Sequence, residues 1–393
     1  MDKEVNVAHV IVNNLGGITS LTKNLIIYTD DNALPQELHL LNIVGSNNTP
    51  AFIDDNIMNK VIPFQLYPKD NWYHVYKSLS NNLNKSNGVL ISNDQYDLVM
   101  LRAFNIDRKI IQIVHDEYNL NLSLQFDDCI DYFIAHSKYI YEQLSIKIPH
   151  RLNDIQLIHY GIPIKENVSR NKNIDQNLKL LFLGRHVKDK GIFDIFEINK
   201  LLKKKNINVT WTILGKGPET VNVIKQWENE SNVTFLTPDT QSEVLDIVKK
   251  NDILVFPTKF EGFPVAILES MSAGCIPIAS DIVGGVQEVV IDNLTGFKCE
   301  MDNNLAFATK IEMLHLNRDI LYSMQQNAIK LTLDHFDINN QCKLYQQFFR
   351  KISENVKRPK HHAVNKKIGS RLDNKLLPNF ITRYLRKASK IIS

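Results

Sequence analysis

The sequence predicts an α/β protein made of two doubly wound domains, and two observations carry this prediction. Short apolar runs, each the length of a buried strand, alternate with longer stretches of helical periodicity along most of the chain. A polar segment without periodicity, Lys165–Asn173, interrupts the alternation once. Such alternation is typical of parallel sheets covered by helices on both faces. We therefore expect two domains of similar size with a ligand between them.

The expected elements follow this pattern in both halves. In the first half the strands are Val5–Asn13, Leu38–Val44, Val89–Asn93, Lys109–His115, Ile130–His136 and Ile155–Tyr160, with helices at Ser20–Tyr28, Asn71–Asn84 and Lys138–Ile146. In the second half the strands are Leu178–Leu183, Val209–Leu214, Val233–Leu236, Ile253–Phe256 and Ile276–Ala279. Their helices are Ile192–Lys204, Glu219–Glu230, Ser242–Lys250, Val265–Ala273 and Gly285–Val290. The expected domains are 1–164 and 178–337, joined by a linker at 165–177 and followed by a helix and a basic tail at 338–393.

Composition and charge exclude several classes of protein. Hydrophobic residues make up 44 % of the 393 residues and charged residues 23 %, which excludes a collagenous, coiled-coil or mostly disordered chain. A net charge of +3 is too small to indicate a nucleic-acid partner. The charge is concentrated, however, because residues 351–393 hold 12 Lys and Arg against 2 Asp and Glu and so carry +10. The tail is therefore far more basic than the rest of the chain.

The sequence also predicts a cytoplasmic location. The four cysteines (Cys129, Cys275, Cys299 and Cys342) lie far apart without a C-x-x-C pair, which favours reduced thiols. The first residues lack the basic and apolar regions of a signal peptide. No apolar stretch approaches the roughly 20 residues that a membrane-spanning helix needs.

The most informative segment runs from Phe256 to Glu269, where a buried strand ends in a loop with Glu261 and a helix follows. Pro264 suits the first turn of that helix, and Glu269 lies roughly 7 Å along it. This spacing fits two contacts on an extended ligand, with the positive end of the helix dipole between them for an anion. A solvated loop glutamate and a capping glutamate would explain the same residues.

Basic residues and glycines follow other strands of the two predicted sheets. Arg185 and Lys190 come after the first strand of the second domain, where ligands bind open α/β sheets, and their charges suit a diphosphate. Gly16 and Gly17 follow the first strand of the chain, where glycines let the backbone approach a phosphate. His115 ends a strand at the equivalent edge. Ordinary βα turns and a packed histidine remain alternatives for all of these.

Several familiar sites are absent from the sequence. It has no G-x-x-x-x-G-K-[ST] phosphate loop, no G-x-S-x-G elbow, no H-E-x-x-H metal site and no D-x-D triplet. Gly215-Lys216-Gly217-Pro218 lacks a third glycine at Thr220, so we interpret it as a βα turn and not as a dinucleotide site. We expect no metal and no cofactor, which leaves Arg185, Lys190 and helix ends to neutralise a phosphate.

Together these segments resemble the family 4 retaining glycosyltransferases of GT-B fold, in which two Rossmann-like domains face each other across a cleft. The resemblance covers roughly residues 5–350 and is most specific in the second domain. It depends on Gly184-Arg185 with Lys190-Gly191, Glu261 with Glu269, Ser272–Ser280, Gly284–Glu288 and Thr295–Phe297, and more loosely on Gly16-Gly17, His115 and His159–Pro163.

The resemblance implies a role for each matching residue. Arg185 and Lys190 would bind the donor diphosphate, Glu261 would lie beside the transferred sugar, and Glu269 would hold the ribose hydroxyls. Backbone N–H groups around Phe263, Pro264 and Val265 (Pro264 itself lacks one) would meet sugar hydroxyls. Gly16 and Gly17 would approach the donor phosphate, and His115 would contact the donor sugar. The expected donor is a nucleotide sugar, a UDP-sugar before a GDP-sugar, and the acceptor is a glycan or a lipid-linked glycan of bacterial surface polysaccharide assembly.

Two rival functions fit the same architecture. A sugar-nucleotide 2-epimerase would have a different set of carboxylates and no acceptor site. A catalytically silent binding subunit would be expected to lack Glu261, Arg185 or Lys190, and all three are present.

The residue pattern of the tail predicts that it contacts either a membrane or the rest of the protein. From Leu377 onward apolar residues recur every three or four positions among basic ones, a pattern typical of an amphipathic helix on an anionic membrane surface. Through 377–393 the protein would lie on the inner face of the plasma membrane. The alternative is that the apolar stripe packs on the protein's own first domain.

Overall fold

The structure is a computed structural model, and it describes residues 5–164, 177–354 and 368–392, apart from 15, 31, 47–49, 51–52, 54 and 239. The expected linker Lys165–Asn173 lies outside the described residues. The chain divides into two compact units. The first comprises Met1–His136, Ile140–Gly161 and Asn339–Ser393, and the second comprises Ser137–Tyr139 and Ile162–Ile338.

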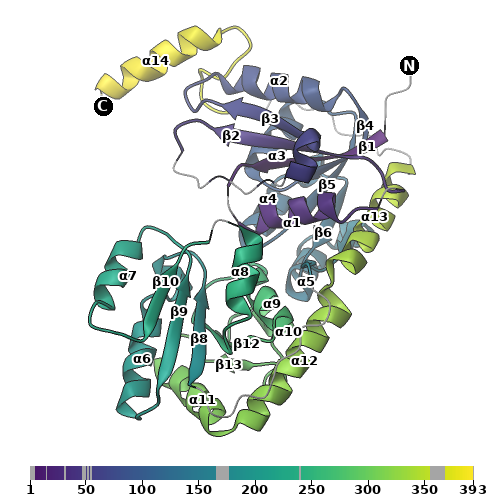
Figure 1. Ribbon diagram of the computed structural model, residues 1–393. Helices are drawn as coiled ribbons and strands as arrows, with labels where there is room; N and C mark the ends of the chain where they lie inside the picture. Colours follow the sequence, from purple (N-terminus) through teal and green to yellow (C-terminus); the bar gives the residue numbers. More distant parts are fainter. Residues whose placement is uncertain are drawn as a thin grey trace. The chain divides into compact units, whose positions relative to one another are not determined.

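The first unit is built on a seven-stranded parallel sheet (Figure 1). Its strand order is β3-β2-β1-β4-β5-β6-β7. The strands are β1 Val5–Val12, β2 Gln36–Ile43, β3 Val61–Leu66, β4 Asn87–Ser92, β5 Lys109–Val114, β6 Tyr132–Ala135 and β7 Ile155–Leu157. The helices are α1 Gly17–Ile27, α2 Trp72–Leu83, α3 Gln95–Ala103, α4 Glu117–Gln125 and α5 Lys138–Lys147, with α13 Ile338–Glu354 and α14 Asn379–Ile392 from the end of the chain.

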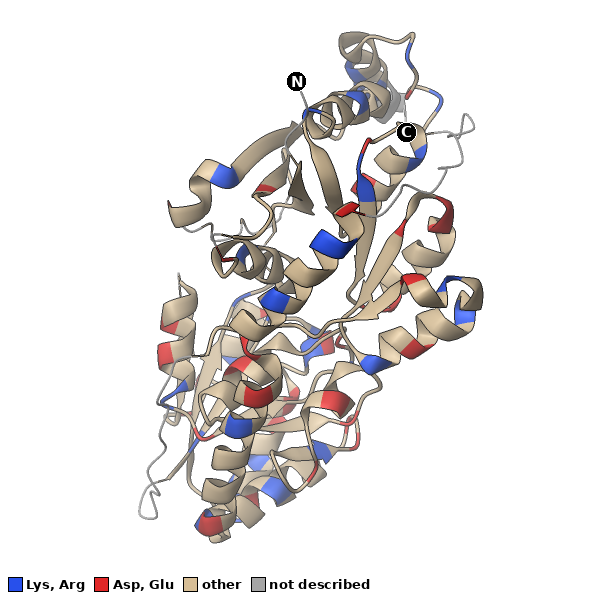
Figure 2. Ribbon diagram, turned by 90° about the vertical axis from the view of Figure 1, so that its right-hand side faces the viewer, with Lys and Arg blue, Asp and Glu red and all other residues tan. Residues whose placement is uncertain are grey.

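The second unit is built on a six-stranded parallel sheet with the order β10-β9-β8-β11-β12-β13. The strands are β8 Leu178–Leu183, β9 Val209–Leu214, β10 Val233–Leu236, β11 Ile253–Phe256, β12 Ile276–Ser280 and β13 Phe297–Cys299. The helices are α6 Asp194–Lys204, α7 Thr220–Gln226, α8 Gln241–Val248, α9 Val265–Ser272, α10 Gly285–Val289, α11 Asn304–Leu316 and α12 Arg318–Phe336. Figure 2 shows acidic and basic residues interspersed along helices of this unit.

Both sheets confirm the predicted fold class of two Rossmann-like α/β halves. In each sheet the first six strands have the order 3-2-1-4-5-6, which is that of dinucleotide-binding folds. The central strands are mostly apolar and largely buried because helices cover both faces of a parallel sheet. Every residue of β5 and of β11 is buried, for example.

The structure contains elements that the sequence pattern did not indicate. Strand β3 carries Pro63, which has no N–H to donate, and it lies at the edge of its sheet where that loss is tolerated. Helices α3 and α4 are only nine residues long, and they are fixed by their caps Asp94 and Asp116. Helix α1 begins three residues before the expected start, at Gly17.

Helix α13 follows the second unit in sequence and packs on the first. The Cys342 thiol lies 3.9 Å from the Asn24 carbonyl oxygen of α1, and the Gln346 amide donates to Thr29 at 3.1 Å. The Tyr345 ring is fully buried, with its hydroxyl 3.3 Å from Nδ1 of His136.

None of the helices in the described ranges combines the length and apolarity that crossing a membrane would require.

Candidate functional site

The predicted phosphate-binding and sugar-binding residues of the second unit meet where its strand order reverses. Strand β8 pairs with β9 on one side and with β11 on the other. In open α/β sheets ligands bind at the carboxyl edge of the strands where the strand order reverses. The loop after β8 holds Arg185 and Lys190, and the loop after β11 holds Glu261.

Backbone contacts tie these two loops together. The amide of Lys259 donates to the carbonyl of Asp189 at 2.8 Å. Gly191 has a φ of 69°, and a Cβ at this position would lie 2.2 Å from the carbonyl oxygen of Pro257. Only glycine permits both this backbone conformation and this approach. The Lys190-Gly191 pair therefore places the lysine directly beside the β11 loop.

Lys190 and Glu261 form an ion pair. The Lys190 Nζ lies 2.5 Å from Oε1 of Glu261 and donates to the Phe260 carbonyl at 3.0 Å. The buried Thr258 hydroxyl donates to the same Glu261 oxygen at 3.3 Å. Burial raises the pKa of Glu261, although the charges of Lys190 and Arg185 oppose that shift. The exposed Arg185 adds a positive charge to the same site.

The glycines after β9 support the loop that carries Arg185. A Cβ on Gly215 would lie 2.0 Å from the Gly184 carbonyl oxygen, and one on Gly217 would lie 2.6 Å from the His186 carbonyl oxygen. His186 is buried, with Nδ1 3.0 Å from the Thr220 hydroxyl. Gly215 and Gly217 thus allow the β9 turn to pack against the β8 loop, which agrees with their interpretation as a βα turn.

Glu269 lies on α9 and contacts a residue that the sequence analysis missed. The side-chain amide of Gln241, the first residue of α8, donates to Oε1 of Glu269 at 2.7 Å. Burial raises the pKa of Glu269 to about 7, and the Gln241 hydrogen bond opposes the shift. The sequence signal for Gln241 was the helix start at Thr240, whose hydroxyl caps the amide of Glu243.

Backbone contacts define the turn before α9. Pro264 is the N-cap and has no N–H, and the amide of Val265 donates to the Phe263 carbonyl at 2.9 Å. A Cβ on Gly285 would lie 2.5 Å from Cδ of Pro264. The Gly284-Gly285 pair therefore brings the loop after β12 against the Phe263–Val265 turn.

The first unit holds the other three predicted residues. Gly16 is the N-cap of α1, and a Cβ there would meet nothing within 4 Å. The Gly17 carbonyl accepts a hydrogen bond from the Tyr160 hydroxyl at 2.8 Å. Nε2 of His115 lies 2.9 Å from Oδ1 of Asn93, after the adjacent strand β4. Burial and the neighbouring His136 hold the pKa of His115 well below its usual value, so its imidazole is neutral.

Glu269→Gln tests the environment of this carboxylate directly. The pKa of Glu269 is about 7 in the folded chain against 4.5 for an unperturbed glutamate, so the folded state binds a proton that the unfolded state lacks between these pH values. This group therefore makes the free energy of unfolding fall as the pH rises from about 4.5 to about 7, by up to about 3 kcal/mol. Glu269→Gln should remove this fall in the free energy of unfolding and so stabilise the ligand-free protein at pH 8. Thermal melts from pH 5 to 8 measure it, with the exposed Glu300→Gln as control. An unchanged pH dependence in Glu269→Gln would contradict the assignment.

A family model matches most of the second unit in sequence. Residues 164–331 match the family model described as "Glycosyl transferases group 1". The match spans the loops after β8, β11 and β12 described above. Across the described part of the chain, no group of three or more His, Cys, Asp or Glu residues could hold a metal ion.

Curated relatives align with part of the chain. The capsular polysaccharide biosynthesis glycosyltransferase CapM of Staphylococcus aureus is 29 % identical over 172 residues, which are 42 % of this chain and 44 % of CapM. The N,N'-diacetylbacillosaminyl-diphospho-undecaprenol alpha-1,3-N-acetylgalactosaminyltransferase of Campylobacter jejuni is 26 % identical over 193 residues, 49 % of this chain and 50 % of that protein. The chain thus spans about half the length of the curated relatives it matches.

Solved structures match over most of the chain. HepE of Anabaena, crystallised with UDP and glucose, has a TM-score of 0.71 at 16 % identity, covering 88 % of this chain and 100 % of that chain. A glycosyltransferase of Rickettsia africae has a TM-score of 0.69 at 17 % identity, covering 90 % and 100 %. At such identities the likeness shows the fold alone, and that fold is GT-B.

Proposed function

We propose that this protein is a retaining glycosyltransferase that moves a sugar from a nucleotide-sugar donor to a glycan or lipid-linked acceptor. The observation that carries the proposal is the Lys190–Glu261 ion pair beside Arg185, at the point where the sheet order reverses within a group 1 glycosyl transferase domain. A charged pair at this edge, with a second cation beside it, suits a ligand that joins a diphosphate to a hydroxylated ring.

In this proposal the second unit binds the donor through the loops after β8 and β11 and through helices α8 and α9. Arg185 and Lys190 hold the diphosphate, and Glu261 lies beside the transferred sugar. Glu269 and Gln241 contact the ribose hydroxyls, since a carboxylate accepts and an amide both donates and accepts hydrogen bonds. From the first unit, Gly16 and Gly17 approach the donor phosphate and His115 contacts the sugar. A UDP-sugar is favoured as donor, and UDP and glucose are bound by HepE.

In the proposed mechanism the acceptor hydroxyl attacks the anomeric carbon of the sugar from the same face from which the diphosphate departs. The bond from the sugar's anomeric carbon to the phosphate oxygen breaks, and a bond from that carbon to the acceptor oxygen forms. The departing phosphate accepts the proton of the acceptor hydroxyl. Arg185 and Lys190 stabilise the negative charge that develops on the diphosphate, which is commonly the largest catalytic contribution. Glu261 and Glu269 have different partners, Lys190 and Gln241, which supports separate roles rather than a nucleophile and acid/base pair.

The proposed setting is assembly of a bacterial surface polysaccharide in the cytoplasm, at the membrane. The name of CapM refers to capsular polysaccharide, and that of the Campylobacter jejuni enzyme to a diphospho-undecaprenol-linked sugar. The four cysteines are free thiols in the structure, in keeping with a reducing compartment. The partners we propose are a nucleotide sugar, the acceptor and, through residues 377–393, an anionic membrane surface.

Nucleotide release measured with and without acceptor tests the proposal against its two rivals. The full chain is incubated with UDP- and GDP-sugars, alone and with lipid-linked glycans from bacterial membranes. A transferase releases the nucleoside diphosphate in an acceptor-dependent way and extends the acceptor. Acceptor-independent conversion to an epimer would identify an epimerase, and donor binding without turnover would identify a silent subunit.

Removal of divalent metal ions is expected to leave activity largely intact. Arg185 and Lys190 supply positive charge for the diphosphate, and the sequence has no D-x-D triplet to anchor a metal–diphosphate complex. Turnover in EDTA, compared with turnover in Mg²⁺ and in Mn²⁺, measures this. Complete loss in EDTA that either ion restores would overturn the metal-free proposal.

A further inference from the structure

Helix α14 carries large apolar side chains that the described part of the protein leaves in solvent. Phe380 and Tyr384 are each 72 % exposed, and Leu376, just before the helix, is 81 % exposed. Such side chains are costly to leave in water. Phe380 and Tyr384 are four residues apart and so lie on one side of the helix, and with Leu376 we term them the α14 apolar face.

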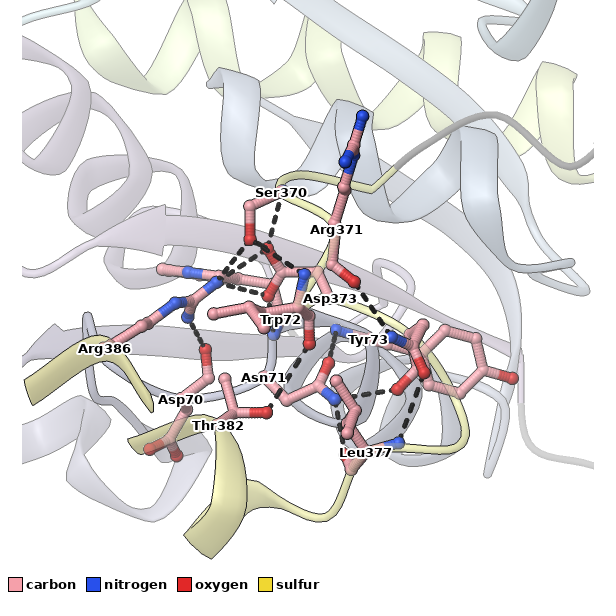
Figure 3. A network of polar contacts seen from close by, with 12 residues as sticks. Asp70, Asn71, Trp72, Tyr73, Ser370, Arg371, Asp373, Leu377, Thr382 and Arg386 are labelled. Carbon is pink, nitrogen blue, oxygen red and sulfur yellow. Dashed lines mark hydrogen bonds and ion pairs between the residues drawn. The ribbon is translucent and has the colours of Figure 1, made fainter. Parts of the chain in front are cut away.

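The opposite side of α14 is held on the first unit by a polar clamp, shown in Figure 3. Asn71, the N-cap of α2, donates from its side chain to the carbonyls of Asn374 and Leu377 at 2.7 and 2.6 Å. The backbone N–H of Asn71 donates to the side-chain oxygen of Asn379 at 2.9 Å. The Trp72 amide donates to the Asp373 carboxylate at 2.8 Å. The tail thereby satisfies the first amides of α2, where an anion is also favoured by the helix dipole.

Two ion pairs complete the clamp. Arg383 pairs with the buried Asp70, and Arg386 donates to both carboxylate oxygens of Asp373 at 2.8 and 2.7 Å. Burial alone would raise the pKa of Asp373, but hydrogen bonds from Trp72, Ser370 and Arg386 hold that pKa below its usual value. The carboxylate is therefore ionised, and the pair with Arg386 is intact, throughout the neutral range.

Helical geometry places the clamp and the apolar face on opposite sides. Successive residues are turned by about 100° around a helix, so Asn379, Thr382 and Arg386 lie within one arc. Thr382 is fully buried in this arc. Phe380, Tyr384 and the 38 % exposed Leu385 lie in the facing arc. Polar residues of α14 make the hydrogen bonds to the first unit, while Leu377 and Ile381 of the predicted stripe are half-buried. Vesicle binding therefore decides between a membrane contact and the expected alternative, packing of the stripe on the first domain.

The charge around this face is positive. The clamp uses Arg383 and Arg386 to neutralise Asp70 and Asp373. The exposed Arg371, Lys375 and Lys387 add positive charge on and beside the helix, and Lys69 adds more next to Asp70. Apolar rings flanked by Lys and Arg match the boundary between the acyl chains and the headgroups of an anionic bilayer, where each nearby cation also adds attraction.

We propose that the clamp holds α14 as a preformed membrane-binding surface, in which Leu376, Phe380 and Tyr384 enter an anionic bilayer and the adjacent Arg and Lys residues contact lipid phosphates. This inference rests on the membrane partner named in the proposed function and specifies the residues that make the contact, which are separate from those proposed to bind the donor.

Flotation with vesicles tests this surface in the full-length protein. Wild type should bind vesicles of phosphatidylglycerol and phosphatidylethanolamine, bind phosphatidylcholine vesicles at least 10-fold more weakly, and dissociate as NaCl is raised. Phe380→Ser with Tyr384→Ser should reduce binding to the anionic vesicles at least 10-fold. The matched control is Val221→Ser with Leu316→Ser, which alters two similarly exposed apolar residues of the second unit and should bind as wild type does.

UDP binding by calorimetry on the same preparations separates this proposal from the catalytic one. The Phe380/Tyr384 double variant should bind UDP as wild type does. Equal vesicle binding by the double variant and wild type would overturn the α14 surface, as would failure of wild type to bind anionic vesicles. Both results leave the donor site to be judged by UDP binding alone.

Discussion

Arg185→Ala is expected to lower turnover by about 10²-fold or more, equivalent to roughly 2.7 kcal/mol of lost transition-state stabilisation. Arg185 is exposed, so its removal should leave the fold and the free energy of unfolding unchanged. In our account its guanidinium stabilises the charge that develops on the leaving diphosphate. Steady-state kinetics with the best nucleotide sugar measure the effect.

Lys190→Ala should cost about as much turnover, but it also leaves Glu261 without its cation. A further rise in the pKa of Glu261 would therefore accompany the loss. Lys188→Ala removes an exposed lysine from the same short turn, Lys188–Lys190, and is the matched control for both variants. Full activity in both Arg185→Ala and Lys190→Ala would rule out the diphosphate assignment.

Glu261→Gln should mainly affect turnover, whereas Glu269→Ala should mainly affect nucleotide binding. Glu261 contacts Lys190 beside the proposed position of the transferred sugar, so Glu261→Gln should lower kcat by roughly 10- to 100-fold with little change in KM. Glu269→Ala should weaken donor and free nucleotide alike, since its proposed partner is the ribose. Kinetics and calorimetry separate the two effects, with Glu300→Gln as a control at an exposed position. Unchanged nucleotide affinity in Glu269→Ala would show the ribose role to be wrong.

Much of the fold was predictable because buried parallel strands are rich in apolar residues. The runs at Lys109–Val114 and Ile253–Phe256 could be placed from hydrophobicity alone. Strand β3 was missed because Pro63 is typical of a loop unless the strand lies at an edge, and edge position is a property of the whole sheet. Helices α3 and α4 were missed because they depend on the single caps Asp94 and Asp116 more than on periodicity.

The candidate site, too, could be predicted only in part from the sequence. Motif spacing singled out Lys190 and Glu261, but their ion pair depends on the adjacency of β8 and β11, which spacing does not encode. Gln241 was missed because it reaches Glu269 from a different helix. In the tail, the periodicity of apolar residues predicted an amphipathic helix, while the docking of its polar side depended on the buried Asp70, Asn71 and Asp373. Long-range polar contacts of this kind leave no local pattern.

Hydrogen–deuterium exchange of the full-length protein with and without UDP tests the central claim most directly, namely that the loops after β8 and β11 bind a nucleoside diphosphate. We expect slower exchange at residues 184–191 and 259–270 when UDP is bound, and loss of that protection in Arg185→Ala. GDP run in parallel would show whether the base matters. Binding of UDP with protection confined to other segments, or no protection of these two segments by either nucleotide at saturating concentration, would contradict it.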